Sequence, residues 1–354
     1  MEAPERKRAV NVAQLAGFDE IIDARSPSEY AEDHVPGALN CPVLDDAERE
    51  RVGTIYKQVS PFEAKKVGAA LVARNIARHI DERFRDRPRG WRPLVYCWRG
   101  GKRSGAMAHV LSEIGWDART LEGGYRAYRR AVIEGLETLP GRFRWRVICG
   151  LTGTGKSRLL AALAERGAQV LDLEELAAHR GSVLGSVPDR PQPSQKMLES
   201  RIWGSLRRFD PERPVYAEAE SKKIGLLRLP DALLSAMWAG EVIRLEMPVS
   251  GRVALLMEEY GHFLASPGLL QEKLGLLHRL YGATVIARWG QLAGAGAWNE
   301  LVAELLQTHY DPAYLRSTRG HYPRYDQGLV LETASGSRDE LLVLANRAIH
   351  WQTG

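Results

Sequence analysis

The 354-residue chain has few cysteines, no long apolar run and little excess charge, and each shortage excludes a class of protein. Three cysteines are too few for a disulfide-rich scaffold, and their number fits a reducing compartment. No apolar run approaches the roughly 20 residues that span a bilayer, and the first residues lack the apolar stretch of a secretory signal. We therefore expect a cytoplasmic protein that does not act at a membrane.

The net charge of +5 is small, but it is unevenly distributed. The stretch from Arg74 to Arg103 holds ten Lys and Arg against three Asp and Glu, and the stretch from Arg119 to Arg146 holds seven Arg against three Glu. A basic field of this kind suits a polyanion, either a nucleic acid or a phosphorylated small molecule. A solvated arginine-rich face explains the charge pattern equally well.

Short apolar runs alternate with helical patterns, which favours an α/β fold with parallel sheets. Hydrophobic residues make up 44% of the chain, enough for the cores of two domains. We expect a parallel-sheet domain over residues 1–138 and a second α/β domain over 139–248, with a mainly helical region over 249–354 that completes the second domain.

The strongest motif is Gly150-Leu-Thr-Gly-Thr-Gly-Lys-Ser157, which follows an apolar run and precedes a helical pattern. It matches the phosphate-binding loop (P-loop), in which backbone N–H groups and a helix N-terminus surround phosphate oxygens. The lysine neutralises the phosphates, and the serine holds Mg²⁺ if a metal is used. The candidate diphosphate ligands are Gly150, Gly153, Thr154, Gly155, Lys156 and Ser157.

A site of this type usually includes a carboxylate at the end of a neighbouring strand. Asp172, Glu218 and Glu220 follow predicted strands and are candidates to orient Mg²⁺ or a substrate hydroxyl. Carboxylates at strand ends also cap loops, and the sequence does not decide between these roles. The run His179-Arg-Gly-Ser182 is a further candidate source of phosphate donors.

The second strong signal is Cys97, which ends an apolar strand and enters a glycine- and cation-rich loop. Backbone N–H groups, a helix N-terminus and nearby cations all lower a thiol pKa, so this loop predicts a nucleophilic thiolate. Cys41 and Cys149 are interpreted as packing residues. The candidate anion-binding residues of the loop are Trp98, Arg99, Gly100, Gly101, Lys102 and Arg103.

Cys97 and Arg103 have the C-x5-R spacing of cysteine-dependent phosphatases, but the surrounding sequence resembles a different domain. Over about residues 10–135 the chain resembles the rhodanese (sulfurtransferase) domain, in which the loop cysteine carries a persulfide. The motifs that carry this resemblance are Asp23-Ala-Arg25, Glu29-Tyr30, His34-x-Pro-Gly-Ala38 and Leu121-Glu-Gly-Gly-Tyr125. The loop is longer than usual for a sulfurtransferase, which suits a bulkier tetrahedral donor.

A rhodanese-like domain followed by a P-loop domain is an uncommon pairing. With Tyr96-Cys-Trp-Arg-Gly-Gly101 and Glu218-Ala-Glu-Ser221, it resembles the tRNA 2-selenouridine synthase family over nearly the whole chain. The resemblance implies an N-terminal rhodanese-like domain and a P-loop NTPase-like α/β domain with a helical C-terminal part. It also implies action on 2-thiouridine at the wobble position in the anticodon arm of tRNA, with selenophosphate as selenium donor, geranyl diphosphate to activate the sulfur, and no tightly bound cofactor.

The resemblance suggests substrates for the basic and the apolar residues: tRNA for the arginine-rich stretches and a geranyl chain for the leucine-rich ones. The tRNA-binding candidates are Arg83, Arg85, Arg87, Arg89 and Arg92, just ahead of the strand that ends at Cys97. The candidates to stack on an unpaired base are Tyr310, Tyr314, Tyr322 and Tyr325, near Arg316, Arg319 and Arg324. The apolar side chains available for a geranyl tail are Leu255, Leu256, Leu269, Leu270, Leu276 and Leu277.

Two other functions fit parts of the pattern. A phosphatase and kinase regulator would use Cys97 and Arg103 on phosphoesters and Lys156 on ATP. An RNA-binding adaptor would use the P-loop only as a nucleotide switch. These hypotheses differ from a tRNA-modifying transferase in whether the nucleosides of tRNA change.

Overall fold

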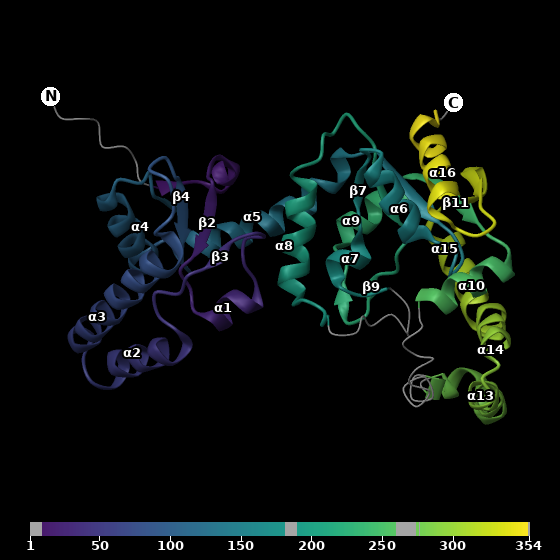
Figure 1. The fold of residues 1–354 in the computed structure, drawn as a ribbon, viewed down its shortest axis with the longest axis horizontal. Helices are drawn as coiled ribbons and strands as arrows, with labels where there is room; N and C mark the ends of the chain where they lie inside the picture. Colours follow the sequence, from purple (N-terminus) through teal and green to yellow (C-terminus); the bar gives the residue numbers. More distant parts are fainter. Residues whose placement is uncertain (1–8, 181–189, 260–273, 276, 353–354) are drawn as a thin grey trace. The chain divides into compact units, whose positions relative to one another are not determined.

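The computed structural model describes residues 9–180, 190–259, 274–275 and 277–352. The chain divides into two compact units, which we describe separately (Figure 1). Unit 1 combines Met1–Gly135 with Pro193–Gly204, and unit 2 combines Leu136–Gln192 with Ser205–Gly354. Every helix in the described ranges is too short or too polar to cross a membrane.

Unit 1 is built on a five-stranded parallel sheet with the strand order β1-β5-β4-β2-β3. Its strands are β1 (Ala9–Val10), β2 (Glu20–Asp23), β3 (Leu39–Asn40), β4 (Pro93–Tyr96) and β5 (Arg119–Leu121). All four residues of β4 are buried, as expected for an apolar strand covered on both faces. Because Asp23 pairs with Tyr96 in the parallel register, the carboxyl ends of β2 and β4 lie side by side.

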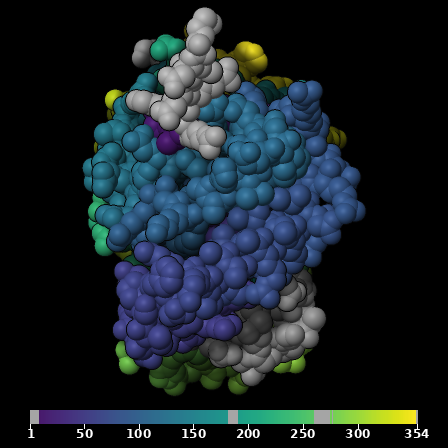
Figure 2. All heavy atoms as spheres, turned by 90° about the vertical axis from the view of Figure 1, so that its left-hand side faces the viewer, coloured from purple at the N-terminus to yellow at the C-terminus, as the bar shows by residue number. Residues whose placement is uncertain are grey.

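Helices cover this sheet and form a core with it around Ile22, Val95, Met107 and Leu111. The helices are α1 (Pro27–Glu32), α2 (Asp46–Gln58), α3 (Pro61–His79), α4 (Lys102–Ile114) and α5 (Gly124–Thr138), with shorter helical turns η1 (Val12–Gly17) and η2 (Ile80–Phe84). The paired helices α2 and α3 lie at the end of unit 1 that faces the viewer in Figure 2.

A segment from the middle of the chain also belongs to unit 1. Pro193–Gly204, which includes most of α8 (Gln195–Leu206), clusters with the N-terminal residues although the sequence places it inside the second domain. Trp203 packs edge-on against Tyr128 of α5, and a Cβ at Gly135 would lie 2.1 Å from the Trp203 indole nitrogen. The hydrophobic pattern of α8 alone does not predict which of the two units the helix packs against.

Unit 2 contains a second five-stranded parallel sheet, with the order β12-β11-β6-β8-β7. Its strands are β6 (Trp145–Cys149), β7 (Gln169–Leu171), β8 (Val215–Glu218), β11 (Glu241–Glu246) and β12 (Leu329–Glu332), and a separate antiparallel pair consists of β9 (Lys223–Ile224) and β10 (Leu227–Arg228). The α/β class predicted from the sequence is confirmed. The edge strand β12 comes from the mainly helical region and joins that region to the second sheet.

The helices of unit 2 form two packing groups. One core joins the sheet to α6 and α16 through Ile148, Leu159, Leu163 and Leu344, and the other lies between α13 and α14 around Trp289. The helices are α6 (Lys156–Glu165), α7 (Leu173–Ala177), α9 (Asp231–Trp238), α10 (Val249–Glu259), α13 (His278–Gly294), α14 (Trp298–Leu305), α15 (Asp311–His321) and α16 (Arg338–His350), with the short turns η3 (Pro140–Arg142), η4 (Leu306–Tyr310) and η5 (Tyr325–Gln327).

Candidate functional site

Cys97 lies directly after β4, at the carboxyl edge of the first sheet. The loop that follows leads into α4 and is tightly closed, because a Cβ at Gly100 would lie 2.4 Å from the carbonyl oxygen of Leu121. The start of α5 closes the other side, where the Tyr125 N–H donates to the Cys97 carbonyl oxygen at 2.8 Å. Strand end, loop and helix N-terminus together form a cradle around the thiol.

The cradle favours the thiolate form of Cys97. Burial alone would raise the pKa of this thiol, but hydrogen bonds from the Ser104 hydroxyl and from the N–H groups of Ser104 and Gly101, together with the charge of Arg103, lower it below its ordinary value. The Ser104 hydroxyl lies 3.2 Å from the sulfur. By contrast, burial raises the pKa of both Cys41 and Cys149 to about 12.

These differences predict selective alkylation. Iodoacetamide at pH 7 should modify Cys97 well before Cys41 and Cys149, because only the thiolate reacts. As pH rises, the rate at Cys97 should reach half its maximum at a lower pH than that of an ordinary cysteine thiol, whereas the other two thiols should stay inert in the folded protein. Peptide mass spectrometry across a pH series measures all three rates. Similar rates at the three cysteines of the folded chain would contradict this assignment.

Two ion pairs fix the surroundings of the loop. Arg25 donates to Asp23 with an Nη2–Oδ2 distance of 2.6 Å, both side chains are almost fully buried, and the guanidinium lies 4.0 Å from the centre of the Tyr125 ring. Arg103 donates to Glu29 at 2.8 Å. The residues of the Asp23-Ala-Arg25 motif and Glu29 therefore support the cradle structurally. The ion pair with Glu29 orients the Arg103 guanidinium beside the loop.

The P-loop connects β6 to α6, as the motif predicts. Gly153 has a φ of +82°, and a Cβ there would lie 2.8 Å from the Leu256 side chain, so glycine is required both for conformation and for space. The helix N-terminus begins at Lys156 and adds partial positive charge to the loop. Lys156 Nζ donates to the Gly150 carbonyl oxygen at 3.0 Å, inside the curve of the loop.

Three carboxylates meet beside the P-loop, and one of them is not predicted from the sequence. The ligand oxygens of Glu174, Glu218 and Glu220 all lie within 4.8 Å of one another. The Ser157 hydroxyl lies 3.2 Å from a Glu174 oxygen and 3.3 Å from a Glu218 oxygen. Asp172, the candidate on this strand end, instead caps α7 by accepting a hydrogen bond from the Glu175 N–H at 2.8 Å.

The electrostatics of this cluster favour neutral carboxyl groups. Burial, with repulsion from Asp172, raises the pKa of Glu174 to about 7, and burial with repulsion from Glu174 raises that of Glu220 to about 8. Burial and repulsion from both of these glutamates raise the pKa of Glu218 well above its ordinary value. Glu218 is 1% exposed, and its Oε1 has no hydrogen-bond partner among the described residues. A cation would supply that partner and offset the repulsion, so this donor set fits a divalent metal.

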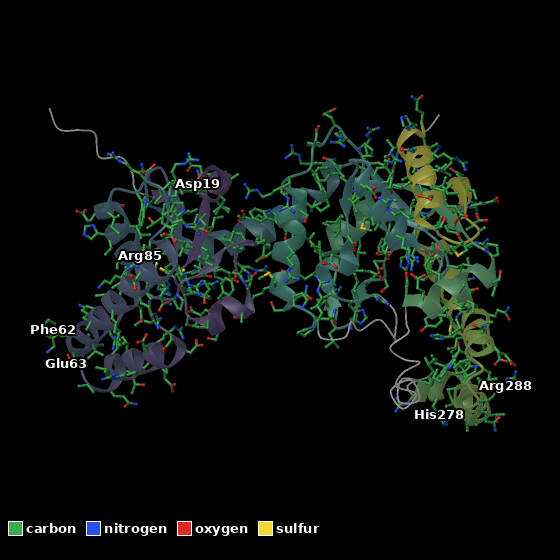
Figure 3. The ribbon with its side chains drawn as sticks, viewed as in Figure 1. Asp19, Phe62, Glu63, Arg85, His278 and Arg288 are labelled. Atoms are coloured by element: carbon green, nitrogen blue, oxygen red, sulfur yellow. The ribbon has the colours of Figure 1, made fainter. Side chains whose placement is uncertain are left out.

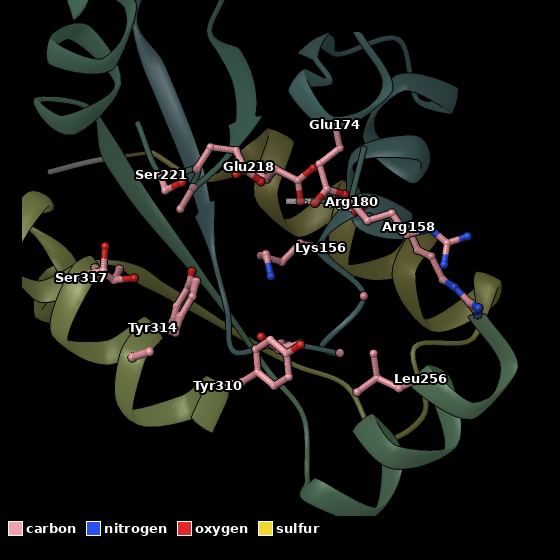
Figure 4. A pocket seen from close by; sticks show the side chains of 18 of the residues that line it. Lys156, Arg158, Glu174, Arg180, Glu218, Ser221, Leu256, Tyr310, Tyr314 and Ser317 are labelled. Carbon is pink, nitrogen blue, oxygen red and sulfur yellow. Dashed lines mark hydrogen bonds between the residues drawn. The ribbon is translucent and has the colours of Figure 1, made fainter. Parts of the chain in front are cut away.

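The P-loop opens into a pocket of about 570 Å³, shown in Figure 4. Lys156 lies between the carboxylates of Glu174 and Glu218 on one side and the rings of Tyr310 and Tyr314 on the other. Cations and carboxylates thus line one part of the cavity, and apolar or aromatic groups line another. The apolar and aromatic lining consists of Leu255, Leu256, Tyr310, Ala313, Tyr314 and Tyr322.

The aromatic wall is bonded to the P-loop. The Gly150 N–H donates to the Tyr314 hydroxyl at 2.8 Å, and Lys156 Nζ lies 5.4 Å from the centre of the same ring. Arg252 of α10 links both elements, since it donates to the Thr152 carbonyl oxygen at 2.8 Å and to Asp311 of α15 at 2.6 Å. The C-terminal helices therefore hold this wall against the phosphate site.

The structure places the other predicted residues as follows. Tyr314 and Tyr322 line the pocket with Tyr310, and Tyr325 lies beside Arg244, which is 5.5 Å from its ring centre. Arg180 lines the pocket and donates to the Glu259 carbonyl oxygen at 2.9 Å. Leu277 is buried in the α13–α14 core. The predicted residues Gly181, Ser182, Leu269, Leu270 and Leu276 lie outside the described residues.

Of the five candidate arginines, Arg87 and Arg92 pair with Glu20 and Asp19 at the start of β2, which is the opposite edge of the first sheet from Cys97. They precede β4, whereas Cys97 follows it, so one strand length of roughly 13 Å separates the two ends. Arg85 pairs with Asp81, Arg87 with Glu20 and Arg92 with Asp19. Arg83 and Arg89 are exposed and have no ion-pair partner within the described ranges. The loop is therefore basic, but it does not adjoin the thiol.

The sequence does not predict Glu174 or the Arg252–Asp311 link, and it suggests Tyr310, Tyr314 and Tyr322 for base stacking and not for the P-loop pocket that they line. Only Glu174 has a local signal: it lies two residues beyond a strand-end aspartate that opens a short helix. The remaining residues reach the P-loop from helices more than 90 positions away in the chain, so no local pattern identifies them.

Two family models match the chain. The rhodanese-like domain model matches residues 7–131, and the model described as the AAA domain of tRNA 2-selenouridine synthase matches residues 143–275. The first covers the cysteine cradle. The second begins just before β6 and covers the P-loop and the three glutamates.

Several curated relatives carry the name tRNA 2-selenouridine synthase. The protein of Aeromonas salmonicida is 32% identical over 83% of this chain and 86% of its own length, and that of Shewanella pealeana is 33% identical over 85% and 83%. The protein of Nitrosomonas europaea is 35% identical over 68% of this chain. That alignment spans 63% of the Nitrosomonas protein, less than two thirds of its length.

Proposed function

Because the chain belongs to the tRNA 2-selenouridine synthase family, we propose that it is a transferase that converts 2-thiouridine to 2-selenouridine at the wobble position of tRNA. The observation that carries the proposal is the presence, in one chain, of an activated thiol in an anion cradle and of a P-loop pocket with an apolar wall. The first suits selenium transfer, and the second suits alkylation of the sulfur by a diphosphate ester.

Geranyl diphosphate is the substrate that best fits the pocket in unit 2. Lys156 and the N-terminus of α6 would bind the diphosphate, and Arg158 and Arg180 line the same cavity. A ten-carbon tail needs an apolar surface, which Leu256 and Tyr310 supply. A cavity of about 570 Å³ lies within the range of small-molecule sites.

Glu174, Glu218 and Glu220 would hold Mg²⁺ together with Ser157. The ion, when bound, neutralises charge that develops on a diphosphate leaving group. The protein would contribute to metal binding by bringing the three carboxylates together next to the P-loop. Lys156 lies between these carboxylates and the aromatic wall.

Selenophosphate is the donor that we assign to the cradle of unit 1. Its tetrahedral anion would accept hydrogen bonds from the loop N–H groups after Cys97 and from the Ser104 hydroxyl, while the charge of Arg103 beside the thiol balances part of its charge. The Cys97 thiolate would then attack phosphorus, so that an S–P bond forms, the P–Se bond breaks and selenide leaves. The selenide would displace geranylthiolate from the ring carbon of the S-geranylated nucleoside, and hydrolysis of the S–P bond would release phosphate and restore the thiol. The P-loop pocket would act first, on the sulfur of the nucleoside, and the Cys97 cradle would then supply selenium to the carbon that carries this sulfur.

The basic loop before β4 is a candidate phosphate contact for the body of the tRNA. Reversing charge at Arg83 and Arg89 should weaken tRNA binding and flatten its salt dependence, by about 0.7 to 0.9 in slope for each phosphate that is no longer neutralised. Filter binding or fluorescence anisotropy over a salt series measures both quantities. The matched control reverses Arg51 and Lys57, two exposed cations of α2. An unchanged slope in the Arg83 and Arg89 variant would show that this loop is only a solvated face.

Nucleoside mass spectrometry tests the proposed function directly. tRNA from cells that lack this chain should contain 2-thiouridine derivatives and no 2-selenouridine, and the purified protein should restore selenouridine when supplied with geranyl diphosphate and selenophosphate. Bound tRNA with unchanged nucleosides would instead indicate an RNA-binding adaptor. Cys97-dependent turnover of an aryl phosphate would indicate a phosphatase.

A further inference from the structure

Trp98, next to the nucleophile, exposes its indole to solvent. It is 37% exposed, whereas the other eight tryptophans, all within the described ranges, are buried or half-buried. The groups that form the anion cradle are backbone N–H groups and the Ser104 hydroxyl, so the cradle does not use the indole. An exposed tryptophan adjoining a reactive thiol therefore needs a separate explanation.

The surrounding residues hold the indole in place. It stacks on Tyr125, with ring centres 5.3 Å apart and an angle of 29° between the planes. Tyr125 is itself buried, and its hydroxyl donates to Asp33 at 2.7 Å. The Arg126 N–H donates to the Trp98 carbonyl oxygen at 3.1 Å. Because the partners of the inner face are fixed, Trp98 offers a preorganised aromatic surface at little cost in conformational entropy.

Three cations are near Trp98 in the chain or through the backbone hydrogen bond from Arg126. Arg99, Lys102 and Arg126 are all exposed and have no ion-pair partner within the described ranges. They differ in this respect from Arg103, which is paired with Glu29, and from three of the five arginines before β4. An aromatic face flanked by unpaired cations matches the combination of stacking and phosphate contacts that binds single-stranded nucleic acid.

We propose that Trp98 is the stacking platform for the target pyrimidine of the tRNA, and that Arg99, Lys102 and Arg126 bind the phosphates on either side of it. The proposal rests on the proposed function and adds to it a binding site for the nucleobase. Single-stranded RNA bases are commonly bound by stacking on aromatic side chains, and a wobble base must leave its own stack before its ring can be modified. Trp98 directly follows Cys97, so a pyrimidine stacked on it would be held at the loop that carries the thiol.

Kinetics of the selenation step test the platform. With S-geranylated tRNA and selenophosphate, Trp98→Ala should raise the KM for tRNA by about 5- to 150-fold, the effect of removing one base–aromatic stack, while Trp98→Phe should restore most of the affinity. The rate of Cys97 alkylation should be unchanged, which separates loss of stacking from collapse of the loop. Phe62→Ala is the matched control, since Phe62 is 66% exposed at the start of α3 (Figure 3).

A binding measurement gives a second readout. An anticodon stem–loop with 2-aminopurine at the wobble position should lose fluorescence when wild-type protein or the Phe62→Ala variant binds it, and should keep its fluorescence on Trp98→Ala. An unchanged KM, or equal quenching by wild type and Trp98→Ala, would overturn the proposal. If wild-type protein and Trp98→Ala make selenouridine equally well, the stacking role of Trp98 is wrong while the proposed function stands. If wild-type protein makes none, the proposed function fails instead.

Discussion

A Cys97→Ser variant should lose selenium transfer to tRNA, with a drop of more than about a thousandfold, the scale on which loss of a nucleophile acts. The cradle lowers the pKa of the thiol, but a serine hydroxyl remains protonated and is a poor nucleophile in the same position. The substitution removes little charge, so tRNA binding and S-geranylation should persist. Mass spectrometry that follows S-geranyl-2-thiouridine and 2-selenouridine separately measures both steps.

The other two cysteines supply the controls for this result. Cys41→Ala and Cys149→Ala remove thiols that are fully buried and whose pKa burial raises to about 12. Both variants should remain active wherever circular dichroism shows that they fold. Selenouridine at the wild-type level in Cys97→Ser would rule out a nucleophilic role for this residue.

The parts of the fold that the sequence predicts are those encoded locally. A short apolar strand, a glycine-rich turn and a helix lie within about 20 residues at both Cys97 and Lys156, so each local pattern predicts its own geometry. The parallel sheets follow because such strand–loop–helix units repeat along the chain. Both loops thus lie at the carboxyl edges of their sheets, as the sequence analysis expects.

The parts that escape prediction depend on contacts between distant residues. Tyr314 reaches Gly150 from 164 positions away in the chain. Trp203 packs on Tyr128, although the first strands of the second sheet lie between these two residues in the chain. At the acidic cluster the first strand-end residue, Asp172, is used as a helix cap, which leaves Glu174 to face the P-loop. Such choices depend on the competition between local hydrogen bonds and tertiary packing, which a sequence pattern does not resolve.

The basic loop gives a further example. In the sequence, the arginines at positions 83 to 92 are close to Cys97, but four residues of β4 carry the chain across the sheet before the thiol is reached. Strand direction therefore separates two features that are neighbours in the chain. Arg126, 29 positions beyond Cys97, is brought back beside Trp98 by the turn between β5 and α5.

Replacing Lys156 by alanine should reduce S-geranylation of thiolated tRNA by about 10²- to 10³-fold, the usual effect of removing one group that stabilises developing charge. In the proposed reaction, attack of the thiocarbonyl sulfur on the allylic carbon would break the bond to the diphosphate, which would leave with both electrons of that bond. Lys156 lies where it can meet this charge, beside the start of α6 and the three glutamates. The Cys97 thiolate in unit 1 should keep its rate of alkylation by iodoacetamide.

The same reaction decides between geranyl diphosphate and ATP as the ligand of the P-loop. Purified wild-type protein, thiolated tRNA and geranyl diphosphate should give S-geranylated uridine with no nucleotide added, because the pocket joins a phosphate site to an aromatic and apolar wall. Arg347→Ala, which removes an exposed cation from α16, is the charge-matched control for Lys156→Ala and should behave as wild type. If the product forms only after ATP is supplied, the P-loop drives a conformational step, as in other proteins with this motif, and the assignment to geranyl diphosphate is wrong.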